Sequence, residues 1–388
     1  MAGLFAFWCG TFHGGSGAWA ATAACASILA LAGIVGRTLH PLSGGGSESW
    51  LLGASVVVLL ASWWTSPVPR AGLSALLLLP AFLLLPSALA AAWQSEAARR
   101  RGLSALSLTV FGASVWALAD RYLAGSPRAA MPLGHHNLLA VWLVTLLPMA
   151  ALGARGRGPA RALAAAAALA GTAALIATGS WAGGVALALE IAVAAVVLEP
   201  RLRRWRWLGG ATVFLALAVL VSLPRLRGLL EGSDTSWSAR EAYLSAGWRG
   251  FLERPLLGWG PGSTPWTLAE FLEPLPGIHP SGELVGDLHN LPLQLLYELG
   301  ASGGALFLIS FVLLLARSTS EARDRPLAVA AKLGWLGFGV ASLGGAPLSV
   351  LALPMALAVV LGAWQAALPG PGFPRTPRVR RWFPWVVA

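Results

Sequence analysis

Charged residues are scarce in this chain. Only 11% of its 388 residues are Asp, Glu, Lys or Arg, whereas soluble domains carry about 25%. Hydrophobic residues make up 56% of the sequence, and the mean hydropathy is +0.69. This composition excludes a soluble enzyme and predicts an all-α, polytopic integral membrane protein.

Candidate metal ligands are sparse as well. Cys9 and Cys25 are the only cysteines, too few for a disulfide framework or a cysteine-based metal site. The aspartates never form the Asp-x-Asp pattern that metal-assisted nucleotide-sugar chemistry would use. His135 and His136 lack a third ligand at useful spacing, so we expect them to cap a helix. The sequence therefore predicts a protein without metal or cofactor.

Long apolar runs dominate what is present. Eleven of them approach the roughly 20 residues that a bilayer-spanning helix needs. The predicted spans are residues 16–36, 50–66, 71–93, 103–119, 137–154, 162–178, 180–198, 208–223, 291–316, 327–345 and 348–367. We therefore expect one membrane domain over residues 1–388 with about 11 (10–12) transmembrane helices.

Arginine clusters mark every second loop between these runs. The clusters occupy residues 99–101, 155–161, 201–206, 317–325 and 375–381. The positive-inside rule places them in the cytoplasm, together with a basic tail at residues 369–388. Such anchors explain most of the net charge of +11, so we expect contact with membrane lipid and no binding of nucleic acid.

The same rule makes residues 224–290 a large extracytoplasmic loop. It holds eight of the 16 acidic residues, so we expect the chemistry to take place there. Apolar residues recur at helical spacing over 235–251 and predict a helix within this loop. Its apolar side, with Leu244 and Trp248, should rest on the membrane domain while Arg240 faces an external cavity.

A break follows this predicted helix. Pro255 cannot continue it, and the glycines in residues 256–262 predict a tight turn. The turn superficially resembles a dinucleotide-binding glycine loop. No strand–helix unit surrounds it, so we exclude that function.

His289 and Asn290 close the large loop, and a seam of Gly300, Gly303 and Gly304 follows in the next apolar run. At about 100° per residue, one helix face would hold His289 and all three glycines. Small residues on one stripe would support the site by letting another helix approach closely. Asn290 suits a helix start, where the dipole favours a bound phosphate and a neutral imidazole. A histidine at a helix end is otherwise a cap or a surface residue.

Glu190 and Lys332 lie within or near predicted spans. Ionisable residues in such places are functional in many membrane proteins, and they leave an alternative open: a transporter or flippase, with the 224–290 loop as its gate. Inverted repeats with paired broken helices would favour that alternative. We find none in the sequence.

Four motifs together resemble the O-antigen ligase and O-antigen polymerase superfamily, which also contains O-linked oligosaccharyltransferases. They are His289-Asn290 separated by nine residues from Gly300-x-x-Gly303-Gly304, Arg240-x-x-x-Leu244 in the large loop, Pro255-Leu256-Leu257-Gly258 in the turn, and Gly134-His135-His136-Asn137 before an apolar run. The resemblance is clearest over residues 134–304. The order of spans also fits, although members of this superfamily usually have twelve.

The resemblance implies a reaction. It is the transfer of a glycan from a polyprenyl-diphosphate carrier to an acceptor hydroxyl at the periplasmic face of the bacterial inner membrane. The acceptor would be the glycolipid lipid A–core for a ligase, another lipid-linked repeat for a polymerase, or a protein for an oligosaccharyltransferase. We favour the ligase because the spacing from His289 to Gly304 fits it most closely. A single displacement without metal would invert the anomeric centre.

The resemblance also implies residue roles. His289 would be the base that deprotonates the acceptor hydroxyl. Arg240 would bind the diphosphate, whose oxygens match a planar guanidinium fork. Asn290 is expected to contact substrate, and Asp287 or Glu283 to orient the imidazole.

One position departs from the family pattern. Many relatives have Ser-Arg after the turn between two central helices, whereas this chain has Ser180-Trp181. A second phosphate-binding arginine is then expected from elsewhere in the chain. The candidates are Arg128, Arg225 and Arg249.

Overall fold

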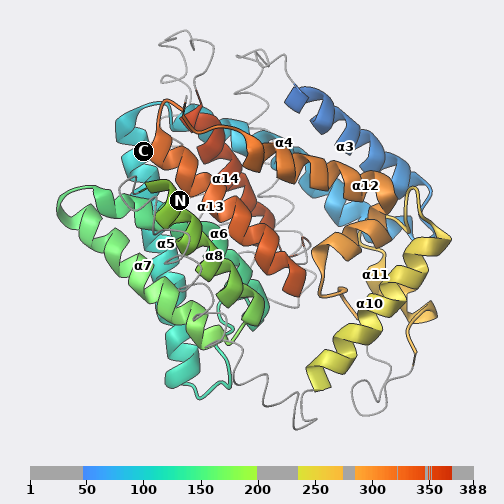
Figure 1. The fold of residues 1–388 in the computed structure, drawn as a ribbon. Helices are drawn as coiled ribbons and strands as arrows, with labels where there is room; N and C mark the ends of the chain where they lie inside the picture. Colours follow the sequence, from blue (N-terminus) through green and yellow to red (C-terminus); the bar gives the residue numbers. More distant parts are fainter. Residues whose placement is uncertain are drawn as a thin grey trace.

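A computed structural model describes residues 47–198, 235–273, 285–320, 322–345, 348, 350 and 352–368. All regular elements in these ranges are helices, the η elements being short 3₁₀ turns. In chain order they are α3 (Ser47–Trp64), η1 (Pro69–Gly72), α4 (Leu73–Ala92), α5 (Glu96–Tyr122), α6 (His136–Leu152), η2 (Gly153–Arg155), α7 (Gly158–Thr178), α8 (Trp181–Leu198), α10 (Thr235–Glu253), α11 (Thr264–Thr267), η4 (Leu268–Glu270), α12 (Leu291–Ala316), α13 (Arg325–Ala341), η5 (Ser342–Gly344) and α14 (Ala352–Ala367) (Figure 1).

The helices follow the predicted spans. Nine of the eleven apolar runs coincide with helices in the described ranges. Five of the described helices are long and apolar enough to cross a membrane, and three shorter apolar helices accompany them. The predicted spans 16–36 and 208–223 and the tail 369–388 lie outside the described residues, so the total of about eleven stays a prediction. The helices described are consistent with a multi-pass membrane protein.

A bundle of α5, α6, α7, α8, α13 and α14 fills one side of the molecule (Figure 1). α6 is its central helix: Leu139, Leu143 and Met149 are completely buried. An apolar helix surface on all sides suits that position. α7 differs, because Leu169 and Ile176 are 74% and 71% exposed. That side of the bundle therefore has the apolar surface that lipid would cover.

The two ends of this bundle differ in their residues. At one end, Arg99 of α5 forms a 3.3 Å ion pair with Asp324, which caps α13. η2, which continues α6, ends on the same side at Arg155. At the other end, α6 begins at His136 and α13 finishes at Ala341. We call these the arginine end and the histidine end.

α12 is broken at Gly300, whose backbone angles are φ 67° and ψ −171°. The segment that follows α10 fills the break. The Tyr297 carbonyl accepts a hydrogen bond from the Trp259 N–H at 3.0 Å. The Ala301 N–H donates to the Pro255 carbonyl at 2.7 Å. A side chain at Gly300 would clash with the backbone of this segment, so the break requires glycine.

The break corrects the expected geometry of the glycine seam. His289 precedes the helix with a φ of 50° and shares no helix face with Gly300. The atoms nearest to a side chain placed at Gly303 or Gly304 belong to leucines of α12 itself. The prediction of one continuous face packed against another helix is wrong. The prediction failed because hydrogen bonds with a distant segment break the helix, and helical periodicity describes only near neighbours in the sequence.

α10 confirms the predicted loop helix but corrects its orientation. Its buried face consists of Ala239, Tyr243, Ala246, Gly247 and Gly250. A Cβ added to Gly247 would lie 2.7 Å from Leu288, which shows how closely the start of α12 approaches. Leu244 and Trp248, the predicted packing residues, are 40% and 49% exposed. Small residues allow this close approach, so the bulky apolar side chains point outward.

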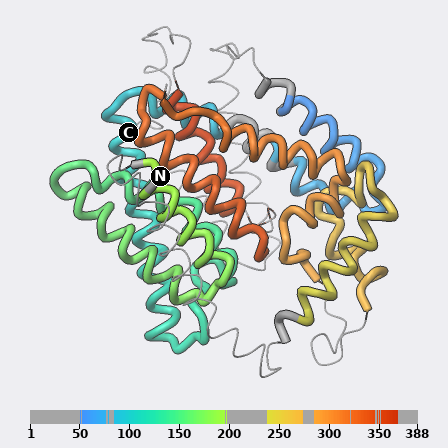
Figure 2. The backbone as a smooth tube through the Cα atoms, viewed as in Figure 1, coloured from blue at the N-terminus to red at the C-terminus, as the bar shows by residue number. Residues whose placement is uncertain are grey.

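The glycine-rich turn after Pro255 is confirmed. It lies between α3 and α12 (Figure 2), and hydrogen bonds connect it to α12 and to Ser66, just after α3. The Glu298 carboxylate accepts hydrogen bonds from the Gly262 N–H at 2.9 Å and the Thr264 hydroxyl at 2.7 Å. It accepts a third from the Gln294 amide at 2.7 Å. We call these four residues the Glu298 brace.

Candidate active site

His289 lies at the histidine end, between the large loop and α12. Its backbone N–H donates to Oδ1 of Asp287 at 2.7 Å, and its ring Nδ1 lies 3.1 Å from the same oxygen. A carboxylate only accepts hydrogen bonds, so the ring proton belongs on Nδ1. Nε2 then carries a lone pair, and no described residue hydrogen-bonds to it. This is the arrangement that a general base needs.

His135 caps α6, as predicted, and this contact fixes its tautomer. Its Nδ1 accepts a hydrogen bond from the Asn137 N–H at 3.2 Å, so the ring proton belongs on Nε2. The His135 ring centroid lies 4.4 Å from that of His136 and 6.3 Å from that of His289. The His135 and His289 planes differ by only 21°. The two rings are therefore stacked neighbours with opposite tautomers.

Burial lowers the pKa of His135 below its ordinary value. The imidazolium form of His289 and the guanidinium groups of Arg240 and Arg128 lower this pKa further. The Asp287 carboxylate acts in the opposite direction. These effects place both arginines within electrostatic range of His135. They also keep the ring neutral at neutral pH, with Nε2–H as its donor.

Tyr243 joins this group of rings and was missed by the sequence argument. Its ring centroid lies 5.7 Å from that of His289, and the residue is 5% exposed. It follows Arg240 by three residues on α10, so the two side chains share a helix face. The spacing of three residues could have indicated that Tyr243 lies beside Arg240. The prediction instead used the bulky apolar residues Leu244 and Trp248, which lie on another side of the helix.

Arg128, in the loop before α6, reaches the same place. Its Nη1 lies 3.0 Å from Nε2 of His136. Its Nε lies 3.8 Å from the position that a Cβ on Gly179 would take, so it sits beside the turn between α7 and α8. In that turn, the Ser180 hydroxyl donates to Oδ1 of Asn137 at 2.9 Å, which ties the turn to α6.

The residues brought together at the histidine end are called the His289 cluster. They are His289, Asp287, His135, His136, Tyr243, Arg128 and Arg240.

Arg249 is placed elsewhere. It forms a 3.0 Å ion pair with Glu273 and donates to the Phe271 carbonyl at 2.7 Å. Arg249 lies nine positions after Arg240, so the two side chains project from nearly opposite sides of α10. The structure therefore associates Arg128 and Arg240, but not Arg249, with the histidines.

Asn290 is engaged in holding the site together. Its side-chain oxygen caps α12 by accepting from the Leu293 N–H at 3.0 Å. Its amide donates to the Leu343 carbonyl of η5 at 3.4 Å, which joins the start of α12 to the end of α13. Two other residues expected near the site, Arg225 and Glu283, lie outside the described residues.

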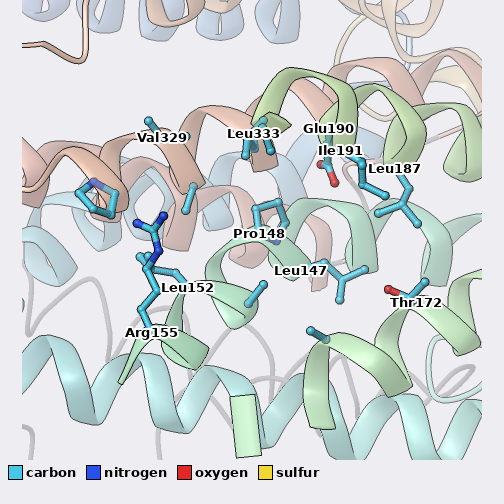
Figure 3. A pocket seen from close by; sticks show the side chains of 15 residues that line it. Leu147, Pro148, Leu152, Arg155, Thr172, Leu187, Glu190, Ile191, Val329 and Leu333 are labelled. Atoms are coloured by element: carbon cyan, nitrogen blue, oxygen red, sulfur yellow. The ribbon is translucent and has the colours of Figure 1, made fainter. Parts of the chain in front are cut away.

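A separate cavity of about 290 Å³ lies toward the arginine end, between α6, α7, α8 and α13. Figure 3 shows apolar side chains between Arg155 on one side and Glu190 on the other. Glu190 is 3% exposed, and within the described ranges its Oε1 has no hydrogen-bond partner. No member of the His289 cluster lines this cavity. In the part of the chain described, no three His, Cys, Asp or Glu residues are grouped as metal ligands.

Residues 165–308 match a family model described as O-antigen ligase. This stretch is an O-antigen ligase domain. It runs from within α7 to just beyond the Gly300 break and contains Arg240, Asp287 and His289. The family is one of membrane glycosyltransferases. The resemblance that the motifs indicated is thereby confirmed, and so is the enzyme class.

The O-antigen ligase domain covers a little over a third of the chain. Arg128, His135 and His136 precede it, so their contribution to the His289 cluster comes from outside the matched stretch. A comparison with curated proteins found no match.

Proposed function

We propose that this chain transfers a glycan from a polyprenyl-diphosphate carrier to a hydroxyl of lipid A–core, the reaction of an O-antigen ligase. One observation carries the proposal: the Asp287–His289 pair leaves Nε2 available within a cluster that contains Arg240 and Arg128. A base beside cations suits a reaction that activates a hydroxyl and releases a diphosphate. The O-antigen ligase domain supports the same class of reaction.

The proposed chemistry is a single displacement. Nε2 of His289 takes the proton of the acceptor hydroxyl, whose oxygen bonds to the anomeric carbon of the glycan. The bond from that carbon to the diphosphate oxygen breaks, and its electron pair leaves with polyprenyl diphosphate. The proton stays on the His289 imidazolium, which Asp287 stabilises across the 3.1 Å contact. Such a displacement inverts the anomeric centre, and the residues proposed here perform it without a metal.

The leaving diphosphate needs cations more than it needs an acid. Guanidinium groups match its oxygens in a planar fork, and Arg240 and Arg128 both act electrostatically on His135. Arg128 lies beside the Gly179 turn, near Trp181, which stands where many relatives carry arginine. We therefore assign the second diphosphate contact to Arg128.

The site belongs, in this proposal, to the periplasmic face of the bacterial inner membrane. The His289 cluster lies at the opposite end of the bundle from Arg99, Arg155 and Asp324, and arginine-rich loops favour the cytoplasm. In a variant without native cysteines, Gly286→Cys should react with an impermeant maleimide added outside intact spheroplasts. Ser320→Cys should react only after lysis. The reverse pattern would contradict the proposed orientation.

The identity of the acceptor can be tested by supplying different acceptors. Purified protein in lipid nanodiscs would be incubated with one defined lipid-linked glycan and, in turn, with lipid A–core, a second lipid-linked glycan or an acceptor protein. We expect product with lipid A–core. Product with only the second lipid-linked glycan would indicate a polymerase, and product with only the protein an oligosaccharyltransferase.

A lipid-linked glycan flippase remains the candidate from another class, because Glu190 is a buried carboxyl without a described partner. Lys332 gives it no support: its Nζ donates to the Leu315 carbonyl at 2.8 Å and to the Arg317 carbonyl, closing the end of α12. Vesicles containing the protein and a labelled lipid-linked glycan separate the two functions. Movement between leaflets without any new glycosidic bond would support the flippase and contradict the transferase.

A further inference from the structure

The two stacked histidines of the His289 cluster present opposite chemistry to their surroundings. Nδ1 of His289 is held by Asp287, which leaves a bare Nε2. Nδ1 of His135 is held by the Asn137 N–H, which leaves an Nε2–H. Across the described ranges, neither Nε2 has a hydrogen-bond partner. In their neutral forms, one ring therefore accepts a hydrogen bond and the other donates one.

We propose that His135 contacts the substrate: its Nε2–H donates a hydrogen bond to the diphosphate of the lipid-linked donor, between Arg128 and Arg240. This proposal rests on the proposed function and deepens it by assigning the acceptor and the leaving group to different histidines. His289 serves the acceptor hydroxyl, and His135 serves the leaving group. His135 precedes the matched O-antigen ligase domain, and the assignment is made from the geometry of the two rings.

The spacing of the rings suits an inverting displacement. Nucleophile and leaving group then lie on opposite faces of the anomeric carbon. Inverting glycoside hydrolases place the groups that serve these two oxygens about 6.5–9.5 Å apart. The ring centroids of His135 and His289 are 6.3 Å apart, just below that range and above the roughly 5–5.5 Å of retaining enzymes.

The tautomer of His135 also defines what this residue does not do. A second base would need a bare nitrogen directed at substrate, whereas the bare nitrogen of His135 is used in capping α6. His135 keeps its proton throughout the reaction. It gains a stronger, charge-assisted hydrogen bond as negative charge develops on the leaving diphosphate.

The competing explanation is that His135 only caps a helix. His135→Asn separates the two roles, because Asn is a good N-cap but lacks the ring Nε2–H. Ser95→Ala is the matched control. It removes the side-chain cap of α5, which accepts from the Ala98 N–H at 3.1 Å, at the arginine end of the molecule.

The first measurement is binding of inorganic pyrophosphate to each protein in lipid nanodiscs, followed by ³¹P NMR. His135→Asn should weaken binding about tenfold, the effect of losing one charge-assisted hydrogen bond. Ser95→Ala should bind like the wild type. Wild-type affinity in His135→Asn, or no binding of pyrophosphate by the wild type, would overturn the assignment.

The second measurement is ¹⁵N NMR of protein labelled at histidine, with the His135 signals assigned by their loss in His135→Asn. We expect His135 to be protonated at Nε2 and that resonance to move when pyrophosphate is added. A purely structural cap would not respond. Protonation at Nδ1, or an Nε2 signal that stays fixed while pyrophosphate binds, would contradict the proposal.

The two proposals fail in different ways. If His135 contacts pyrophosphate but no acceptor is glycosylated, the transferase function falls and the diphosphate contact stands. If glycan transfer is observed and His135→Asn transfers at the wild-type rate with wild-type pyrophosphate affinity, the role of His135 falls and the function stands.

Discussion

The Glu298 brace is centred on α12, whereas His289 lies in the loop just before that helix. The brace and the His289 cluster differ in how fully their hydrogen bonds are used. The Glu298 carboxylate accepts from Gly262, Thr264 and Gln294. In the His289 cluster, Asp287 and Asn137 each occupy one nitrogen of a ring. Both Nε2 atoms are left without a partner among the residues described.

This difference separates structure from chemistry. A fully hydrogen-bonded carboxylate stabilises the segments that it joins. Ring nitrogens left open beside cations are available to a ligand. The brace ties the first half of α12 to the segment that follows α10. Substitutions in the two groups should therefore affect different measurements.

The largest effect is expected from His289→Ala. Loss of the base should lower the rate of glycan transfer by about 10²–10⁴-fold, measured by single turnover with a defined lipid-linked donor. The melting temperature and pyrophosphate binding should stay near their wild-type values, because the brace and the arginines are unchanged. Normal turnover would remove the base assignment.

Glu298→Leu should act on stability. The substitution leaves the Thr264 hydroxyl and the Gly262 N–H without their acceptor and should cost about 2–4 kcal/mol of unfolding free energy. The measurement is thermal or denaturant unfolding in detergent. Glu273→Gln is the control, because the Glu273 side chain is 77% exposed in its ion pair and should contribute little. Equal stability of the two variants would show that the brace has no structural role.

Arg240→Lys and Arg249→Lys compare two arginines on opposite sides of α10. A lysine point charge lacks the guanidinium fork, so kcat/KM for the lipid-linked donor should fall about tenfold. Arg249→Lys alters a residue paired with Glu273 on the opposite side of α10 and should leave donor kinetics unchanged. Equal kinetics for both variants and the wild type would make Arg240 an interfacial anchor.

The smallest effect concerns pH. Burial lowers the pKa of His135 below its ordinary 6.5, so the unfolded chain binds a proton before the folded protein does as the pH falls. Stability should be complete above about pH 6.5 and decline as the pH drops through the folded pKa. His135→Asn should lose less stability than the wild type between pH 7.5 and 5.5, followed by melting temperature. Identical pH dependence would contradict a neutral, partly buried His135.

The sequence alone predicted the helices well, because apolar length and flanking arginines act locally. It also indicated His289, Arg240 and Asp287, whose residue types suit a base, an anion contact and an orienting carboxylate. Asn290 and Pro255 were placed correctly at a helix start and a helix end, since capping and proline geometry involve only near neighbours.

Long-range contacts account for what the sequence did not predict. Gly300 breaks α12 because a segment more than thirty residues earlier supplies hydrogen bonds to it, which no local pattern contains. The face of α10 was assigned by its bulky residues, whereas Gly247 and Gly250 determine its packing. Tyr243 was missed for the same reason. The tautomers of His135 and His289 depend on contacts that appear only in three dimensions.

The central claim, inverting glycan transfer at the His289 cluster, is tested most directly by the configuration of the product. The purified protein would be given a lipid-linked glycan of known anomeric configuration and lipid A–core, and the new glycosidic bond examined by ¹H NMR. We predict one product with the inverted configuration from the wild type and none from His289→Ala. A retained configuration, or lipid-linked glycan recovered without a new bond, would contradict the mechanism.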